Sequence, residues 1–229
     1  MNSSHPAKTA ILIFANSAEE DVKHKPIPKG KKLFDALTKT TLKTVETAGL
    51  PYFHFTEKQQ IGATFGERYS NAIQAIFNKG FDKVITIGND SPKLKAHHIN
   101  EAVKQLETNK VVLGPSLDGG FYLLAIQKAN FNKEQFFHLP WQTNSIKKTL
   151  LALIVTNNNS KVSFLPYLSD IDSVEDIHYI FNFSFILPKQ LRLLFLEIIK
   201  EFKIVINYYS LFFSSLKRSI YFNKGSPIF

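Results

Sequence analysis

The sequence contains no cysteine among its 229 residues. This absence excludes a disulfide framework, a zinc site built on thiolates and a cysteine nucleophile, and it favours a reducing compartment, the cytoplasm. The sequence also has no run of about 18 uncharged apolar residues, which a membrane-spanning helix needs. Its first apolar run, Ala10–Ala15, is short and leads into charged residues, so it does not predict a secretory signal.

Motifs of several large enzyme classes are missing as well. Neither a Walker-type nor a dinucleotide-binding glycine fingerprint is present, and the nucleophile elbow of the serine hydrolases does not occur. The seven histidines are scattered along the chain and lack the spacing of zinc ligands. These absences argue against the corresponding nucleotide-binding, hydrolytic and zinc-dependent classes.

The charge is strongly positive, with a net value of +9 and a pI near 9.5. Such an excess favours an anionic partner. Residues 183–229 carry seven Lys and Arg against two acidic residues, so this segment holds more than half of the excess. A basic run with interleaved aromatic residues is typical of nucleic-acid binding, and residues 1–182 contain no such run. The charge therefore favours a phosphate-bearing ligand and not nucleic acid.

Short β-branched apolar runs alternate with segments of helical periodicity. This alternation predicts a doubly wound α/β fold, with a mostly parallel sheet covered by helices on both faces. Ligands of such sheets bind beyond the carboxyl ends of the strands, so the predicted loops at 15–32, 88–92 and 114–120 matter most. The expected strands are Thr9–Phe14, Pro51–Phe55, Lys83–Ile87, Val111–Leu113, Phe121–Ile126 and Val162–Leu165; the expected helices are 33–48, 65–78, 96–106, 143–154 and 174–181.

The sharpest local motif is Gly88-Asn89-Asp90-Ser91-Pro92, which directly follows a predicted strand. It brings a carboxylate to the carboxyl edge of the sheet, where Gly88 lets a ligand approach the backbone. A carboxylate there can bind Mg²⁺ or Mn²⁺, which prefer oxygen ligands and usually keep waters and substrate phosphates in their shell. The motif alone is equally compatible with a turn in which Asp90 caps the next helix.

Two further acidic motifs follow. Asp118-Gly119-Gly120 permits backbone shapes that let a bulky substrate lie against the main chain, but Asp-Gly is also a common hairpin turn. In the segment 168–176, Asp172 or Ser173 is expected to cap a helix. Asp172 could bind a metal together with Asp90 only if the fold brings the two side chains together.

An ordered set of short segments between residues 10 and 181 carries a family resemblance. The segments are Ile11–Ala15, Phe65–Arg68, Gly88–Pro92, Val112–Pro115 with Asp118–Leu124, Pro140–Trp141 and Asp170–Asp176. In this order they resemble the bacterial radical-SAM/selenodomain-associated transferases. That group is GT-A-like and is related to glycosyltransferases and to molybdopterin- and phospholactate-type nucleotidyltransferases.

The resemblance implies a nucleotide-diphospho-sugar transferase domain over residues 1–182. It places the nucleotide over the loop after the first strand, near Ala15, Lys23, Lys25, Gly88 and Asn89. It places a divalent metal, Mg²⁺ or Mn²⁺, on Asp90 with Asp172 as the second carboxylate. Gly119, Gly120 and Trp141 would border the sugar or acceptor, and Asp118 would serve as the catalytic base toward the acceptor hydroxyl.

One stretch departs from the family pattern. The family carries a basic Lys-Thr-Arg-Leu-type stretch after the first strand, and here Val22–Pro26 stands at that place. Lysine keeps the positive charge but lacks the bidentate geometry of a guanidinium. Three functions therefore stay open: a metal-dependent glycosyltransferase, a nucleotidyltransferase on the same fold, and a non-catalytic descendant that binds a ligand or partner. The loop after the first strand lacks the glycines common in nucleotidyltransferases, which favours a glycosyltransferase enzyme.

Residues 183–229 lie outside the resemblance and are predicted to form an amphipathic helical extension. Its apolar stripe could pack on the domain or on a second copy of the chain as a homodimer. Alternatively, its basic residues could hold it on an anionic membrane surface, making the protein peripheral to the membrane. The stripe consists of Leu187, Leu191, Leu194, Ile198, Phe202, Val205, Tyr209, Phe212 and Leu216.

Overall fold

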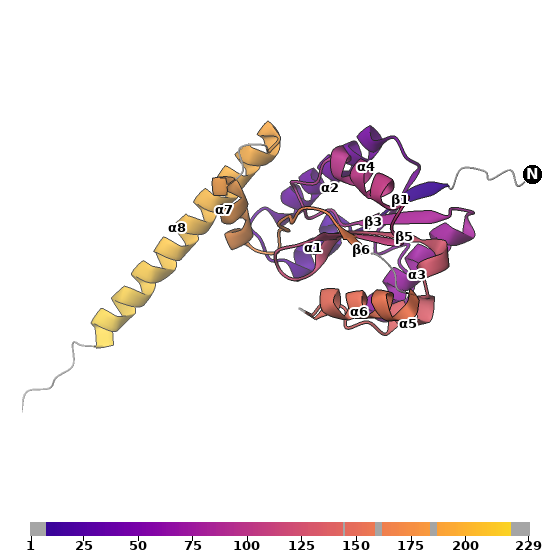
Figure 1. Cartoon of the computed structure of the whole chain (residues 1–229). Helices are drawn as coiled ribbons and strands as arrows, with labels where there is room; N and C mark the ends of the chain where they lie inside the picture. Colours follow the sequence, from indigo (N-terminus) through magenta and orange to yellow (C-terminus); the bar gives the residue numbers. More distant parts are fainter. Residues whose placement is uncertain (1–7, 144, 159–161, 184–186, 221–229) are drawn as a thin grey trace, which may run out of the picture.

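A computed structural model describes residues 8–143, 145–158, 162–183 and 187–220 of the chain, and the side chains of 155–158 and 205–220 are left out of the description. Its centre is a six-stranded sheet with the strand order β2-β1-β3-β5-β4-β6 (Figure 1). The strands are β1 Thr9–Phe14, β2 Tyr52–Phe55, β3 Lys83–Ile87, β4 Val111–Pro115, β5 Phe121–Gln127 and β6 Val162–Phe164.

The sheet is mostly parallel, as the sequence predicts. β1 runs parallel to β2 and β3, and β4 runs parallel to β6, whereas β5 is antiparallel to both β3 and β4. The reversal of β5 follows from the short connection 116–120, because a parallel pair would need a crossover of a dozen or more residues. The Asp118-Gly119 turn therefore forms a hairpin, which was one of the two interpretations of that motif.

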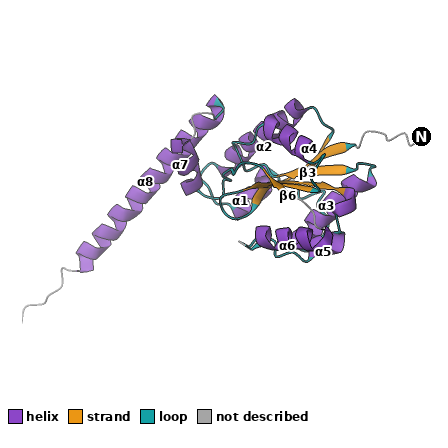
Figure 2. Cartoon of the chain, in the orientation of Figure 1, coloured by secondary structure: helices purple, strands orange, loops and turns teal. Residues whose placement is uncertain are grey.

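Helices cover both faces of the sheet, and a further helix pair lies at one end (Figure 2). Alternate side chains of β1 point to opposite faces: Ala10 and Leu12 pack against α3, α5 and α6, whereas Ile11 and Ile13 pack against α2 and α4. This is the period-2 alternation of a strand buried on both sides. The helices are α1 Ala18–His24, α2 Gly30–Ala48, α3 Phe65–Asn78, α4 Ala96–Gln105, α5 Lys133–Phe137, α6 Ile146–Asn158, α7 Val174–Phe183 and α8 Lys189–Ile220, with a short 3-10 helix at Lys128–Asn130.

The loop predicted at 15–32 is wrong in part, because it contains α1 and the first residues of α2. Ser17 caps α1 by accepting a hydrogen bond from the Glu20 amide through its hydroxyl oxygen, at 3.3 Å. The first turn of α1 is acidic, which suits the positive end of the helix dipole. Pro26, Pro28 and Gly30 dominated the sequence-based interpretation, but they follow α1 and do not interrupt it. The short helix α5 was also missed.

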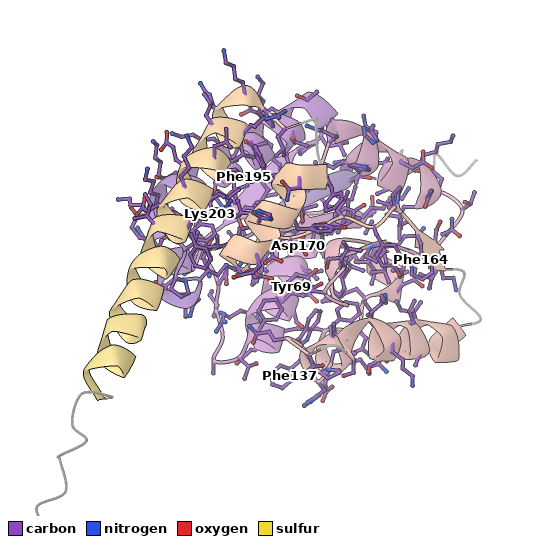
Figure 3. All side chains as sticks on the ribbon, turned by 90° about the vertical axis from the view of Figure 1, so that its left-hand side faces the viewer. Tyr69, Phe137, Phe164, Asp170, Phe195 and Lys203 are labelled. Carbon is purple, nitrogen blue, oxygen red and sulfur yellow. The ribbon has the colours of Figure 1, made fainter. Side chains whose placement is uncertain are left out.

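Besides the two cores on the faces of the sheet, the chain has a third hydrophobic core. The first half of α8 belongs to it, together with residues of α1, α2 and α7. Phe195 and Ile198 are fully buried there, beside Leu37 of α2 and Ile177 of α7. Phe195 lies where α8 meets the body of the domain, and the helix then continues away from it (Figures 1 and 3). The predicted stripe packs on the chain itself up to Phe202, and its members from Val205 onward lie outside the described side chains.

Within the described part of the chain, no helix combines the length and the apolar character that crossing a membrane requires.

Candidate functional site

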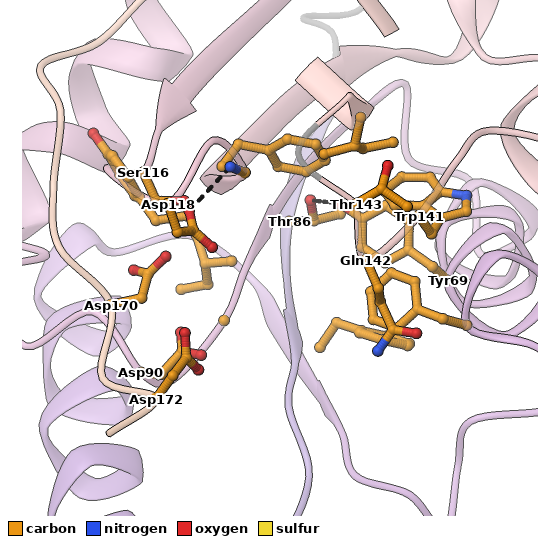
Figure 4. Close-up of a pocket in the computed structure, with 18 residues that line it drawn as sticks. Tyr69, Thr86, Asp90, Ser116, Asp118, Trp141, Gln142, Thr143, Asp170 and Asp172 are labelled. Atoms are coloured by element: carbon orange, nitrogen blue, oxygen red, sulfur yellow. Dashed lines mark hydrogen bonds between the residues drawn. The ribbon is translucent and has the colours of Figure 1, made fainter. Parts of the chain in front are cut away.

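A cavity of about 380 Å³ opens at the carboxyl edge of the sheet, between the ends of β1 and β3 and the β4–β5 connection. Its two sides differ in chemistry: carboxylates gather on one side and aromatic rings on the other (Figure 4). The lining residues are Phe14, Phe65, Tyr69, Thr86, Ile87, Gly88, Asp90, Ser116, Asp118, Gly120, Phe121, Tyr122, Trp141, Gln142, Thr143, Ile146, Asp170 and Asp172.

The acidic side is assembled from three segments far apart in sequence. Asp90 follows β3, Asp118 lies in the β4–β5 connection, and Asp170 and Asp172 lie in the segment before α7. Backbone hydrogen bonds fix that last segment beside the other two: the Leu168 amide donates to the Pro115 carbonyl at 3.2 Å, and the Ile171 amide donates to the Asp90 carbonyl at 3.0 Å. The fold thus brings Asp172 and Asp90 together, which the sequence could not show.

Lys25 joins these two carboxylates directly. Its Nζ lies 2.9 Å from Asp90 Oδ2 and 2.7 Å from Asp172 Oδ1, and it also donates to the Ile171 carbonyl at 3.1 Å. Burial by itself lowers the pKa of Lys25, but the charges of Asp90 and Asp172 outweigh it and raise this pKa above its ordinary value. Lys25 therefore stays protonated and places a positive charge between the two predicted metal ligands.

Asp170 is a site residue that the sequence reasoning missed. Its carboxylate accepts a hydrogen bond from the Ser91 hydroxyl. Burial, followed by the negative charge of Asp90, raises the pKa of Asp170 to about 7. Asp170 can therefore hold a proton near neutral pH, next to carboxylates that face the same cavity. The signal that could have found it is the alternation Asp170-Ile171-Asp172, which places two carboxylates on the same side of an extended segment.

The glycines of the two loops make room for the carboxylates. Gly120 donates its amide to Asp118 Oδ1 at 3.0 Å, and a Cβ at Gly120 would lie 3.3 Å from that oxygen. A Cβ at Gly88 would lie 3.0 Å from Asp90 Oδ1. Gly119 has a φ of 98°, in the left-handed region that favours glycine, and completes the turn. Gly88, Asp118 and Gly120 line the cavity, and Gly119 lies beside it.

The aromatic side is built around Trp141. Its ring lies 4.8 Å from the ring of Tyr69, 5.5 Å from that of Phe65 and 6.0 Å from that of Phe121, measured between centroids. The Trp141 Nε1 group donates to the Phe136 carbonyl at 2.6 Å, and the Tyr69 hydroxyl pairs with the hydroxyl of Thr86. Both polar groups are thus engaged within the protein, so these rings offer mainly carbon surface to the cavity.

Of the five residues predicted to bind nucleotide, Gly88 lines the cavity, whereas Ala15, Lys23, Lys25 and Asn89 do not. Ala15 is buried and donates its amide to the Phe55 carbonyl at 3.2 Å. The Asn89 side chain donates to the Thr38 hydroxyl at 2.9 Å and is buried as well. Lys23 is exposed on α1 and pairs with Glu20 at 2.6 Å. Asn89 thus serves the packing of α2 against the loop after β3.

The donor set of the acidic side fits a divalent metal held by few protein ligands. Asp90 and Asp172 already converge on one cation, the Lys25 ammonium. Mg²⁺ is commonly bound through one or two carboxylates, with waters and substrate phosphates completing its shell. No cluster of three or more metal-ligating side chains occurs among the described residues. The arrangement therefore suits an ion shared between protein and ligand, and it does not form a cage made by protein alone.

Comparison by sequence gives a match to one family model. Residues 36–143 match a family model described as "Uncharacterized protein conserved in bacteria (DUF2064)", a span that includes Asp90, Asp118 and Trp141. No curated protein matches the chain in sequence.

Solved structures show the same architecture. A candidate nucleotide-diphospho-sugar transferase from Desulfovibrio desulfuricans G20 superposes with a TM-score of 0.71 at 20% identity, covering 89% of this chain and 99% of that protein. The 4-diphosphocytidyl-2C-methyl-D-erythritol synthase from Anaerococcus prevotii DSM 20548 superposes with a TM-score of 0.51 at 13% identity, covering 76% and 96%. The chain thus has the fold of nucleotide-diphospho-sugar transferase-like proteins, as the resemblance of its motifs predicts.

Proposed function

We propose that this chain is a metal-dependent glycosyltransferase that uses a nucleotide-diphospho-sugar donor. The observation that carries the proposal is the convergence of Asp90 and Asp172 on one cation, within 2.9 Å, at the carboxyl edge of the sheet. Ligands of open α/β sheets bind at this edge. Membership in the radical-SAM/selenodomain-associated group is part of the same proposal.

The charge of the acidic side supports a role for a divalent cation. Four carboxylates line the cavity, namely Asp90, Asp118, Asp170 and Asp172, and they would repel a diphosphate. A divalent cation held by Asp90 and Asp172 would offset this repulsion and the negative charge that develops on the departing nucleoside diphosphate. Lys25, which follows α1, adds a positive charge beside these two carboxylates.

Asp118 is the residue that we assign as the base. In the transfer step the acceptor oxygen forms a bond to the anomeric carbon of the sugar while the bond from that carbon to the diphosphate breaks. The electron pair leaves with the nucleoside diphosphate, and the acceptor proton passes to Asp118. The main chain at Gly88 and Gly120 leaves space for the sugar, and the face of Trp141 packs against the sugar or the acceptor.

A nucleotidyltransferase on the same fold is the second candidate, and one observation speaks against it. Nucleotidyltransferases commonly hold phosphates with a glycine-rich loop after the first strand. Here the helix α1 occupies that place, and residues 15–29 contain no glycine. We therefore favour transfer of a sugar over transfer of a nucleotide.

The test is a thermal-shift and calorimetric screen of nucleoside diphosphates and nucleotide sugars, with and without Mn²⁺ or Mg²⁺. A ligand that binds only the folded state at a hundredfold excess over its Kd adds about 2.7 kcal/mol to the free energy of unfolding. We expect a metal-dependent shift that Asp90→Asn abolishes and that Asp35→Asn, on the exposed side of α2, leaves intact. A metal-dependent shift without turnover of any sugar donor would instead indicate the non-catalytic descendant, and no shift at all would refute the proposal.

A further inference from the structure

The Lys25 side chain occupies the position between Asp90 and Asp172 where the proposed cation would lie. Its three ammonium hydrogens match three acceptors: Asp90 Oδ2 at 2.9 Å, Asp172 Oδ1 at 2.7 Å and the Ile171 carbonyl at 3.1 Å. Among the described ion pairs, Lys25 is the partner of both carboxylates. The two oxygens that would face a metal are thus already bound to a positive charge.

The backbone around Lys25 is anchored, so any movement has to come from the side chain. Lys25 ends α1 with its amide donating to the Asp21 carbonyl at 2.9 Å. Two residues later Ile27 is buried in the third core, and Lys29 pairs with Glu197 of α8 at 3.0 Å. The flexible stem of a lysine can swing its ammonium without moving this backbone.

We propose that Lys25 and the divalent cation compete for Asp90 and Asp172, so that binding of the ion expels the Lys25 ammonium from the acidic pair. Two positive charges cannot share the same two carboxylate oxygens, because their repulsion adds to the loss of the lysine's hydrogen bonds. Lys25 thereby offsets one of the two negative charges while the metal is absent, and it lowers the affinity for the ion. This inference rests on the metal site of the proposed function.

The first experiment measures Mn²⁺ affinity by electron paramagnetic resonance for the whole chain and for Lys25→Met. Methionine keeps most of the length of the side chain and removes the ammonium, so we expect Mn²⁺ to bind at least tenfold more tightly. The matched control is Lys23→Met, which removes a positive charge two residues away on α1 but leaves the acidic pair untouched, because Lys23 pairs with Glu20. Mn²⁺ affinity of this control should stay within about twofold, since exposed charges interact weakly through water.

The second experiment follows the lysine itself. The wild-type chain is acetylated briefly with an N-hydroxysuccinimide ester, with and without Mn²⁺, and modification is read for each lysine by mass spectrometry. Expulsion from the acidic pair should raise labelling of Lys25 several-fold on addition of Mn²⁺, while labelling of Lys23 stays constant. Asp90→Asn should abolish the increase, because it removes one of the two carboxylates.

The outcomes separate this inference from the proposed function. Tight Mn²⁺ binding by the wild type with an equal affinity for Lys25→Met, or with unchanged labelling of Lys25, overturns the competition and leaves the metal site standing. Failure of Mn²⁺ to bind either protein, each shown to be folded by its melting temperature, overturns the metal dependence and the competition together.

Discussion

Gly66 provides a test of the site. Replacing a helical glycine with alanine usually stabilises a protein, whereas at Gly66 we expect the same change to destabilise it. Gly66 lies in the first turn of α3, where alanine ordinarily stabilises a helix by about 0.5–1 kcal/mol. Here a Cβ would lie 2.5 Å from the Phe137 carbonyl oxygen and 2.6 Å from Cδ1 of Trp141. One of these atoms belongs to the backbone, and the Trp141 ring is tied to the Phe136 carbonyl at 2.6 Å. Neither neighbour can yield without breaking other contacts.

We therefore expect Gly66→Ala to destabilise the protein. Overpacking of this kind costs about 1–3 kcal/mol, which exceeds the gain in helix propensity. In a domain of this size each kcal/mol corresponds to about 2–4 °C in melting temperature. Trp141 is the single tryptophan of the chain, so its fluorescence reports the same displacement directly. The measurement is a thermal melt together with the emission spectrum of the folded state.

The matched control is Gly80→Ala. Gly80 has a φ of 89° and no atom within 4 Å of its Cβ position, so alanine there strains the backbone without touching the site. It should lower the melting temperature and leave the Trp141 emission unchanged. A raised melting temperature for Gly66→Ala, or an emission spectrum identical to that of the wild type, would refute the packing that we describe around Trp141.

Two further predictions concern Asp170 and α8. Because burial raises the pKa of Asp170 to about 7 from its usual value of 3.8, its folded pKa lies above its unfolded pKa, and stability is lost as the pH rises from about 4 to 7. Asp170→Asn, which mimics the protonated acid, should therefore gain stability over the wild type across that window, by about 1.4 kcal/mol per pKa unit at most. Urea unfolding of both proteins at pH 4.5 and pH 8, in chelator, checks this. A difference in the free energy of unfolding that is the same at both pH values would contradict it. Phe195→Ala should lower the free energy of unfolding by about 3–5 kcal/mol because Phe195 is fully buried. Leu193 is half exposed on the same helix, so Leu193→Ala should change that free energy by about 0.5 kcal/mol or less. Equal effects of the two substitutions would mean that α8 is not part of the folded core.

The sheet could be predicted from the sequence because its strands carry a local signal. Thr9–Phe14 and Lys83–Ile87 are short β-branched runs that the fold buries on both faces, and each is followed by a segment with clear helical periodicity. The loop at 88–92 could be placed at the carboxyl edge for the same reason, since a strand that ends at Ile87 delivers Asp90 there. Local patterns were sufficient for these features.

The contacts that define the site are not local, and the sequence could not supply them. Lys25 meets Asp172, a residue near the other end of the domain, through an ion pair that no spacing rule predicts. The resemblance assigned Lys25 to the nucleotide, whereas the fold places its ammonium on the two carboxylates. Asp170 was overlooked because an enclosed carboxylate is recognised by what surrounds it, Ser91 and Asp90, and these come from the loop after β3.

The two sides of the cavity divide the tasks of recognition under the proposed function. Trp141 and Tyr69 have their polar groups bound to the protein, so these two rings can select a ligand by shape and apolar surface. The acidic side repels phosphates until a cation neutralises it. Since Lys25 already supplies one positive charge there, a diphosphate gains a favourable site only when a divalent ion replaces that charge. The cation should therefore bind before or together with the nucleotide, and nucleotide affinity measured in chelator should be weak even when the site is fully folded.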